Sequence, residues 1–253
     1  MPLLDARPVK SILLVLASSN RGLCGSFNSN VLKAAGIILS KKEELAIHRI
    51  EGGKSIEPVA GELSVDVLGI GKKSALFAKR NQLNLIGVFD HFADNIDVDD
   101  VMPISRMIID AFTKKTYDKV AIVFTHFRSS LVQETKVRQL LPISSVDLQK
   151  MIDELPRPVS AVEGIGDIDT YTLEPSREAI LEGVLPRLIE VELYQALLES
   201  SASEHSARMV AMKSASDAAG DMVDSLTLMS NKARQAAITQ EIAEIAGGAA
   251  ALE

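Results

Sequence analysis

The sequence has a single cysteine, Cys24, no tryptophan, and aromatic side chains at only 4% of its 253 residues. A lone cysteine excludes an internal disulfide and any metal site built on a cysteine pair, and it favours a reducing compartment. No stretch reaches the roughly 18 apolar residues that a membrane-spanning helix needs, so we expect any membrane association to be indirect. The scarcity of aromatic residues suits a helix-rich protein with an aliphatic core.

An excess of positive charge is also missing. The chain has 34 acidic and 27 basic residues and a formal net charge of −7. A protein that binds nucleic acid needs a basic stripe to neutralise phosphates, so nucleic acid is excluded as the main partner. The hydrophobic content of 47% is enough for a real core, and the length predicts one or two domains.

Helix-breaking residues are almost absent from the last third of the chain. Between Leu185 and Ala246 there is no proline beyond the first turn, where Pro186 lies, and only one glycine, Gly220. A proline in the first turn costs little because its missing N–H has no intrahelical partner there. The segment predicts an unbroken helix about 90 Å long at about 1.5 Å per residue. Ordinary helices have about 11 to 12 residues, so this helix has a dedicated purpose.

Small and apolar residues recur along this helix at alternating steps of three and four, which is the seam of a coiled coil. The seam residues are Met212, Ala215, Ala219, Met222, Leu226, Met229, Ala233 and Ala236. A seam this narrow requires a partner helix but does not identify it. On spacing alone, a coil that only dimerises the chain is an equally good interpretation.

Strand-like and helix-like segments alternate before the long helix. The pattern predicts an α/β fold, with a parallel or mixed sheet covered by helices on both faces, as in a Rossmann-like layer. Asp99 or Asp100 is expected to cap one of its helices. We expect a Rossmann-like domain over residues 1–145, a linker with a short strand and a helix over 146–184, and the long helix over 185–253. The predicted strands cover 11–17, 63–70, 85–89 and 119–127, and the predicted helices begin near 30, 74, 99 and 177.

The search for catalytic chemistry finds no complete motif. The segment EGGKS (51–55) lacks the first glycine of a phosphate-binding loop, because His48 stands in its place. The segment GIGKK (69–73) lacks the third glycine of a dinucleotide fingerprint. The histidines have no metal-ligand spacing, and His205 is interpreted as solvated or facing a partner. Cys24 is interpreted as a small buried loop residue. We therefore predict no catalytic residue, no metal and no cofactor.

Two segments carry a specific resemblance. VLASSNRGLCGSFNSNV (15–31) and the terminal stretch that begins ASEHSARMVAMK (from 202) closely resemble the gamma subunit of F-type ATP synthases. The segments FTHFRSSLVQETKVRQLLPI and YTLEPSREAILEGVLPRLIEVELYQALLES add matches in the correct order. The resemblance covers most of the chain and is weakest between 40 and 65.

The resemblance implies a rotor that makes no covalent bond itself. The Rossmann-like domain would be the foot of a central stalk, and the long helix would rise into a ring of three alpha and three beta subunits. The foot would contact the ring of c subunits and the epsilon subunit. Such a protein would be peripheral to the bacterial inner membrane on its cytoplasmic side.

Particular residues acquire roles through the same resemblance. Arg234, Gln235 and Thr239 match positions that meet the catch loop of a beta subunit. Tyr171 and Glu174 match the part of the foot that touches the c ring. The end of the helix, from Ile242 to Leu252, resembles an apolar tip held in a bearing of alpha and beta subunits.

The chain also departs from the family pattern. Family members begin with another long helix that pairs with the terminal one, whereas this sequence begins near the first strand. We expect that the chain is truncated, that a separate polypeptide supplies the helix, or that the start codon was misplaced. Asn20 stands where the family usually has aspartate. Two other functions stay open at this stage, a coiled-coil adaptor that dimerises and a Rossmann-type enzyme that uses a nucleotide.

Overall fold

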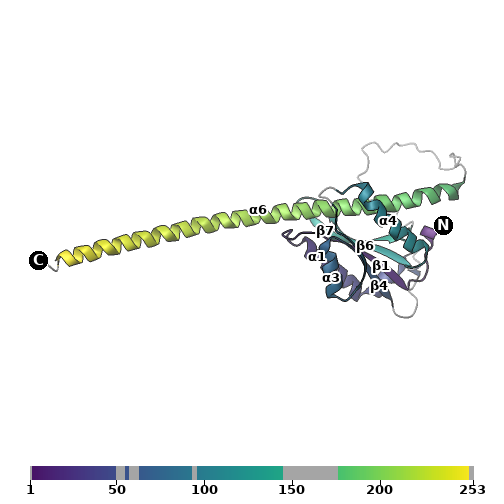
Figure 1. Ribbon diagram of the computed structural model, residues 1–253, viewed down its shortest axis with the longest axis horizontal. Helices are drawn as coiled ribbons and strands as arrows, with labels where there is room; N and C mark the ends of the chain where they lie inside the picture. The colour runs from purple at the N-terminus through teal and green to yellow at the C-terminus, as the bar shows by residue number, and fades with distance from the viewer. Residues whose placement is uncertain (1, 50–54, 57–62, 93–95, 145–175, 251–253) are drawn as a thin grey trace.

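The computed structural model describes residues 2–49, 55–56, 63–92, 96–144 and 176–250. They form an α/β foot from which one very long helix projects (Figure 1). The elements are η1 (Pro2–Leu4), β1 (Ser11–Ala17), α1 (Phe27–Ser40), α2 (Lys42–Ala46), β2 (His48–Arg49), β3 (Ser55–Ile56), β4 (Ser64–Ile70), α3 (Lys72–Arg80), β5 (Asn84–Phe89), α4 (Val98–Thr113), β6 (Lys119–Phe127), β7 (Gln133–Leu141) and α6 (Arg177–Ala250). The predicted α/β class with a long terminal helix is confirmed.

The main sheet has five strands in the order β5-β4-β1-β6-β7. The first four are parallel, and β7 runs antiparallel to β6. Strands β1 and β6 lie in the middle of this order and are almost continuously buried, because both faces of a parallel sheet are covered by helices. The sheet is therefore mixed, as the sequence allowed.

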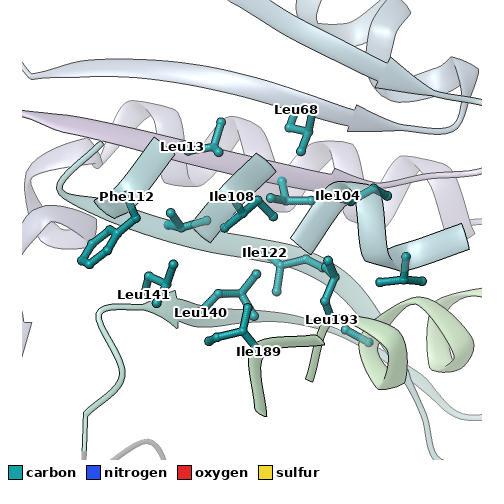
Figure 2. Packing of buried hydrophobic residues seen from close by; sticks show 14 of the residues in the cluster. Leu13, Leu68, Ile104, Ile108, Phe112, Ile122, Leu140, Leu141, Ile189 and Leu193 are labelled. Carbon is teal, nitrogen blue, oxygen red and sulfur yellow. The ribbon is translucent and has the colours of Figure 1, made fainter. Parts of the chain in front are cut away.

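Helices cover both faces of the sheet, and alternate side chains of β1 pack into the hydrophobic clusters on opposite faces. Leu14 and Leu16 pack with α1 and α3, whereas Leu13 and Val15 pack with α4 and α6. Figure 2 shows the second layer, in which side chains from α4, α6 and the strands interdigitate. The first turns of the long helix are thus part of the core of the foot.

The cap of α4 differs from the prediction. Asp97 is the N-cap residue, and its carboxylate accepts the amide of Val98 at 2.6 Å. Asp100 completes a capping box by accepting the amide of Asp97 at 3.1 Å. The predicted caps, Asp99 and Asp100, therefore lie in the first turn, where negative charge also favours the helix.

Helix α6 begins earlier than the position of Pro186 suggested. It runs without interruption from Arg177, and the hydroxyl of Ser176 accepts the amide of Ala179 at 3.1 Å at its start. Pro186 lies inside the helix, where it removes one backbone hydrogen bond. The burial of Leu185 and Ile189 on either side of it offsets this cost.

A partly buried ion pair joins the segment before β1 to the residue before β6. Arg7 Nε donates to Asp118 Oδ1 at 2.6 Å, and Arg7 Nη2 donates to the carbonyl of Tyr117 at 2.7 Å. The other carboxylate oxygen of Asp118 accepts the amides of Lys10 at 2.9 Å and Ser11 at 3.1 Å. Burial raises the pKa of Asp118, but the hydrogen bonds from Arg7, Lys10 and Ser11 outweigh it and hold the pKa below its usual value.

We expect Asp118→Asn to destabilise the foot by about 2 kcal/mol near neutral pH, since the amide cannot replace a charged acceptor. The folded pKa lies below the unfolded one, so the carboxylate stabilises the fold above the usual value of 3.8 and loses this effect as pH falls through the folded pKa. Urea unfolding of the unsubstituted chain and of the Asp118→Asn variant, at neutral and at acid pH, measures the difference in their free energies of unfolding. This difference should be smaller at acid pH.

The matched control removes a carboxylate from an exposed pair. Glu134 contacts Arg128 at 3.2 Å, and Glu134→Gln should change stability by less than about 1 kcal/mol at any pH. An equal loss in both variants would contradict the special role of Asp118.

Candidate functional site: the projecting helix

The most prominent feature of the molecule is the part of α6 that leaves the foot. Every side chain from Met212 to Gly248 is exposed, and no described element lies against this part of the helix (Figure 1). At 1.5 Å per residue it extends roughly 55 Å beyond the foot. A helix that stands alone in water is only marginally stable, because helices in proteins gain most of their stability from packing against other elements. The projecting part of α6 therefore requires a partner.

The predicted seam lies on this projecting part and is open to solvent. Met222 is 65% exposed, Leu226 58% and Met229 62%. Monomeric proteins rarely leave such a continuous apolar line uncovered. The structure thus places all the predicted seam residues on one helix with their side chains available, but the helix that would pair with them is not among the described residues.

A polar cluster lies beside the seam on the projecting helix. Successive residues are about 100° apart around a helix, so Arg234 and Gln235 lie about 100° to 160° from Ala233 and Ala236, and Thr239 lies about 60° to 120° from them. Arg234 Nη2 donates to Asn231 Oδ1 at 3.3 Å. The hydroxyl of Thr239 donates to the carbonyl of Gln235 at 2.8 Å, and its lone pairs remain able to accept. One partner can therefore occupy the seam while another binds the polar cluster.

The end of the helix is apolar and slender. Ile242 is 62% exposed and Ile245 is 74% exposed, and the following residues are glycine and alanine. The predicted tip runs from Ile242 to Leu252, and its last residues, from 251 on, lie outside the described part of the chain.

The foot holds the helix first by apolar packing. Leu185, Ile189, Leu193 and Leu197 are all buried against the core formed with β6, β7 and α4 (Figure 2). Each buried leucine or isoleucine side chain contributes about 1.5 to 3 kcal/mol. The lower part of α6 and the sheet therefore behave as one body.

Polar contacts replace this apolar packing just before the helix leaves the foot. Glu199 Oε2 lies 2.5 Å from Nδ1 of His126 on β6. Two serines further along α6 donate hydrogen bonds from their hydroxyls to backbone carbonyls. Ser203 donates to Thr125 at 3.4 Å, and Ser206 donates to Ser130 at 2.9 Å. The absence of metal-ligand spacing among the histidines gave no indication of this junction. No local pattern could have found it, because His126 and Glu199 lie 73 positions apart.

A hollow of about 590 Å³ opens between α6 and the loops that follow β1, β4 and β5. Ser201, His205 and Arg208 line it from the helix, and they occupy the same heptad positions as the seam. His205 is exposed, as the sequence predicted. The heptad positions of the seam therefore continue over the foot and line part of this hollow.

The loop after β1 occupies the backbone amides at the start of α3 that a bound phosphate would need. The first amides of α3 donate to this loop, Lys72 N to Asn20 Oδ1 at 3.1 Å and Ser74 N to Ser18 Oγ at 2.7 Å. Gly71 approaches the loop so closely that a Cβ there would lie 2.2 Å from the carbonyl oxygen of Ser18. The GIGKK segment is thus a packing contact, and the helix N-terminus is not free for a nucleotide.

Asn20 uses both ends of its amide. Its Oδ1 accepts from the amide of Lys72, and its Nδ2 donates to the carbonyl of Asp90 at 2.9 Å. An aspartate at this position could not donate, so asparagine changes the contact rather than only removing a charge.

In the same loop, Cys24 is 2% exposed and its Sγ accepts from Asn28 Nδ2 at 3.0 Å. The interpretation of Cys24 as a small buried loop residue is confirmed.

Two predicted contact residues lie outside the described residues. Tyr171 and Glu174, the expected c-ring contacts, fall in the stretch 145–175, and their roles stay predictions. The described part of EGGKS is Ser55 alone. None of the described helices combines the length and the apolar character needed to cross a membrane.

Comparison with known proteins gives a consistent result. A family model described as ATP synthase matches residues 1–252. The chain is 40% identical over 252 residues to the ATP synthase gamma chain of Roseiflexus castenholzii (strain DSM 13941 / HLO8), covering 99% of this chain and 76% of the relative. It is 36% identical over 251 residues to the ATP synthase gamma chain of Legionella pneumophila (strain Corby), covering 99% and 77%. The chain thus spans about three quarters of the length of these relatives.

Solved structures with the same fold come from rotary complexes. One is the Euglena gracilis mitochondrial ATP synthase OSCP/F1/c-ring in rotational state 3, with a TM-score of 0.62, 18% identity and coverage of 96% of this chain and 73% of that one. Another is the central stalk and c ring of the Tetrahymena thermophila mitochondrial ATP synthase, with a TM-score of 0.53, 23% identity and coverage of 84% and 79%. At these identities the likeness concerns the fold.

Proposed function

Because this chain belongs to the family of ATP synthase gamma chains, the non-catalytic subunits of the central stalk, we propose that its projecting helix rotates inside the catalytic head and couples rotation of a membrane ring to ATP synthesis or hydrolysis. The observation that carries the proposal is the continuity of α6 from the core of the foot to its free end. Torque applied to the foot reaches the tip through one unbroken hydrogen-bonded helix.

Asymmetry is as important as stiffness in this mechanism. A shaft that touches all three catalytic sites equally could not favour one conformation in any of them. The exposed helix presents an apolar seam on one side and the polar side chains of Arg234 and Gln235 on another, so each orientation offers a different surface. The gamma chain would thus act by differential contact and supply no reacting group.

We infer that a second helix covers the seam and continues over the foot. Exposed apolar residues stand at heptad spacing at Val184, Val191, Leu198 and Met212, in register with the upper seam, and His205 occupies the position between the last two. A helix lying along this line would also cover the hollow beside His205. Two paired helices resist bending and twisting better than one, which suits the proposed role.

The polar cluster is the proposed contact with the catch loop of a beta subunit. Arg234 keeps a charged guanidinium, which forms strong hydrogen bonds with carboxylates. Gln235 and Thr239 add neutral donors and acceptors beside it. We propose further that the foot contacts the c ring and the epsilon subunit at the cytoplasmic side of a bacterial inner membrane, with Tyr171 and Glu174 among the contacts.

The Arg234→Ala variant tests the catch contact. Loss of a charge-assisted hydrogen bond of about 1.5 to 3 kcal/mol should weaken binding of the chain to a reconstituted ring of alpha and beta subunits roughly 10- to 100-fold. The ATPase activity coupled to rotation should fall as well. Titration of labelled chain with the ring measures the first effect, and rotation-coupled turnover measures the second.

The control is Lys213→Ala, which removes a positive charge from the same exposed helix 21 positions away, about 32 Å along the axis at 1.5 Å per residue. Lys213 is too far from Gln235 and Thr239 to share their partner, so its loss should alter the affinity by less than about threefold. Equal effects of the two substitutions would mean that only general charge is sensed and would refute the catch contact.

A further inference from the structure

The two edges of the main sheet are protected very differently. Strand β7 forms one edge, and its sequence QETKVRQLL places the charged residues Glu134, Lys136 and Arg138 at alternate positions. Strand β5 forms the other edge, and its sequence NLIGVF contains no charged residue and no proline. Charge and proline are the usual means by which an edge strand avoids pairing with another chain. Only the β7 edge has such protection.

The β5 edge is also exposed and apolar. Ile86 is 38% exposed and Val88 is 37% exposed on the strand, and Leu76 on the neighbouring helix α3 is 59% exposed. A groove of about 680 Å³ runs between the strand and the helix, and its floor is formed by Ala75, Leu83 and Leu85. Among the described residues no strand pairs with the outer side of β5. The edge combines free backbone hydrogen-bonding groups with an apolar groove.

The charges around this groove are predominantly positive. Helix α3, which forms one wall, has the sequence KKSALFAKR, with four basic residues and no acidic one. Lys72 and Lys79 lie at the rim of the groove, and the acidic residue there, Asp90, is 4.0 Å from Lys72. A ligand that lies along the groove therefore meets an apolar lining with Lys79 at its rim and with Lys72, which lies beside Asp90.

From these observations we propose that the β5 edge is a docking site for an extended segment of a partner protein that adds a strand to the sheet and carries acidic residues on both sides of an apolar stretch. Backbone hydrogen bonds to β5 would supply affinity, and the groove would select alternate apolar side chains. A second copy of this chain is disfavoured as the occupant, because its own β5 edge would bring another basic α3 against the first. The inference goes beyond the rotary function and does not depend on it.

The test uses the full chain and two synthetic peptides in which valine and threonine alternate, one ended by glutamates and the other by lysines. The glutamate-ended peptide should bind and slow amide hydrogen exchange in β5 but not in β7. The lysine-ended peptide should bind roughly tenfold more weakly at low salt, and added salt should reduce this difference.

An introduced negative charge separates a loss of binding from a loss of folding. Val88→Glu should weaken the glutamate-ended peptide and strengthen the lysine-ended one, which an unfolded edge could not do. The matched control, Val137→Glu, places the same charge on the β7 edge, where Val137 is 44% exposed, and should leave both affinities unchanged. The proposal would be overturned if the two peptides bound equally well, or if they slowed amide hydrogen exchange in strands other than β5. It would also be overturned if exchange in β5 slowed only with the concentration of the chain itself. Failure here would leave the Arg234 contact untouched, so the two proposals can fail separately.

Discussion

Replacing Gly220 by proline should abolish coupling while leaving the foot folded. Gly220 lies in the exposed part of α6, and nothing beyond the helix's own nearby backbone lies within 4 Å of the position where a Cβ would be. Proline removes a backbone hydrogen bond and clashes with the preceding turn, so it kinks the helix at a cost of about 2 kcal/mol relative to glycine. A kinked shaft cannot hold its upper part on the rotation axis. ATP synthesis by the reconstituted enzyme should fall to the background rate.

The same position provides the control. Gly220→Ala should stabilise the helix by about 1 kcal/mol, since glycine is the poorer helix former, and coupling should persist. Circular dichroism should show less helix in the proline variant and at least as much in the alanine variant, with an unchanged unfolding transition of the foot. A proline variant that synthesises ATP at the unsubstituted rate would show that a continuous rigid helix is not required.

Replacing Gly71 by alanine should cause the largest loss of stability in the foot. Gly71 has φ +84°, which strains any residue with a side chain, and a Cβ would lie 2.2 Å from the carbonyl oxygen of Ser18. Ser18 cannot retreat, because its amide donates to the carbonyl of Ile70 at 2.8 Å and its hydroxyl accepts from Ser74. We expect a loss above about 4 kcal/mol, which lowers the melting temperature by roughly 10 °C.

A second glycine in the adjoining loop shows whether the effect is local. Gly22 has no neighbour within 4 Å of its Cβ position, so Gly22→Ala should shift the melting temperature by no more than about 2 °C. Thermal unfolding followed by circular dichroism separates the two variants. If Gly71→Ala melts within this range as well, the close contact between the β1 loop and α3 is not important for stability.

These predictions separate the two parts that rotation would need. The foot depends on close contacts such as Gly71 with Ser18 and on the partly buried pair of Arg7 with Asp118, and it holds the lower turns of α6 in its core. The projecting part depends on helix continuity and on partners for its two faces. A defect in the first part should lower stability, whereas a defect in the second should lower coupling in a stable protein.

Much of the fold could be predicted from local patterns. The long helix followed from the near absence of proline and glycine after Pro186, and the central strands followed from continuous apolar runs such as Ser11–Ala17. The failures were positional. Asp97 caps α4 in place of Asp99 or Asp100, because several aspartates in a row offer equivalent caps and only the backbone geometry selects one. Pro186 lies within α6 because core packing outweighs the local cost of proline.

The candidate site was predictable only in part. The spacing of three and four located the seam from Met212 to Ala236, because periodicity along one helix is a local property. Arg234, Gln235 and Thr239 came from the family resemblance, and the helix geometry added that Arg234 and Gln235 point away from the seam whereas Thr239 lies nearer to it. The junction of His126 with Glu199 was missed, since neither residue has a local signal and their meeting depends on how α6 crosses β6.

The sequence by itself determined the properties that arise within one element, namely the unbroken helix, its apolar seam, the buried strands and the absence of a complete catalytic motif. The tertiary structure alone decided where the helix leaves the foot, which loop occupies the amides at the start of α3, and which edge of the sheet is left unprotected. The physical reason is the range of the interactions. Helix propensity and periodicity act over a few residues, whereas sheet order and the contacts of Gly71 or Glu199 join segments that only the folded chain brings together.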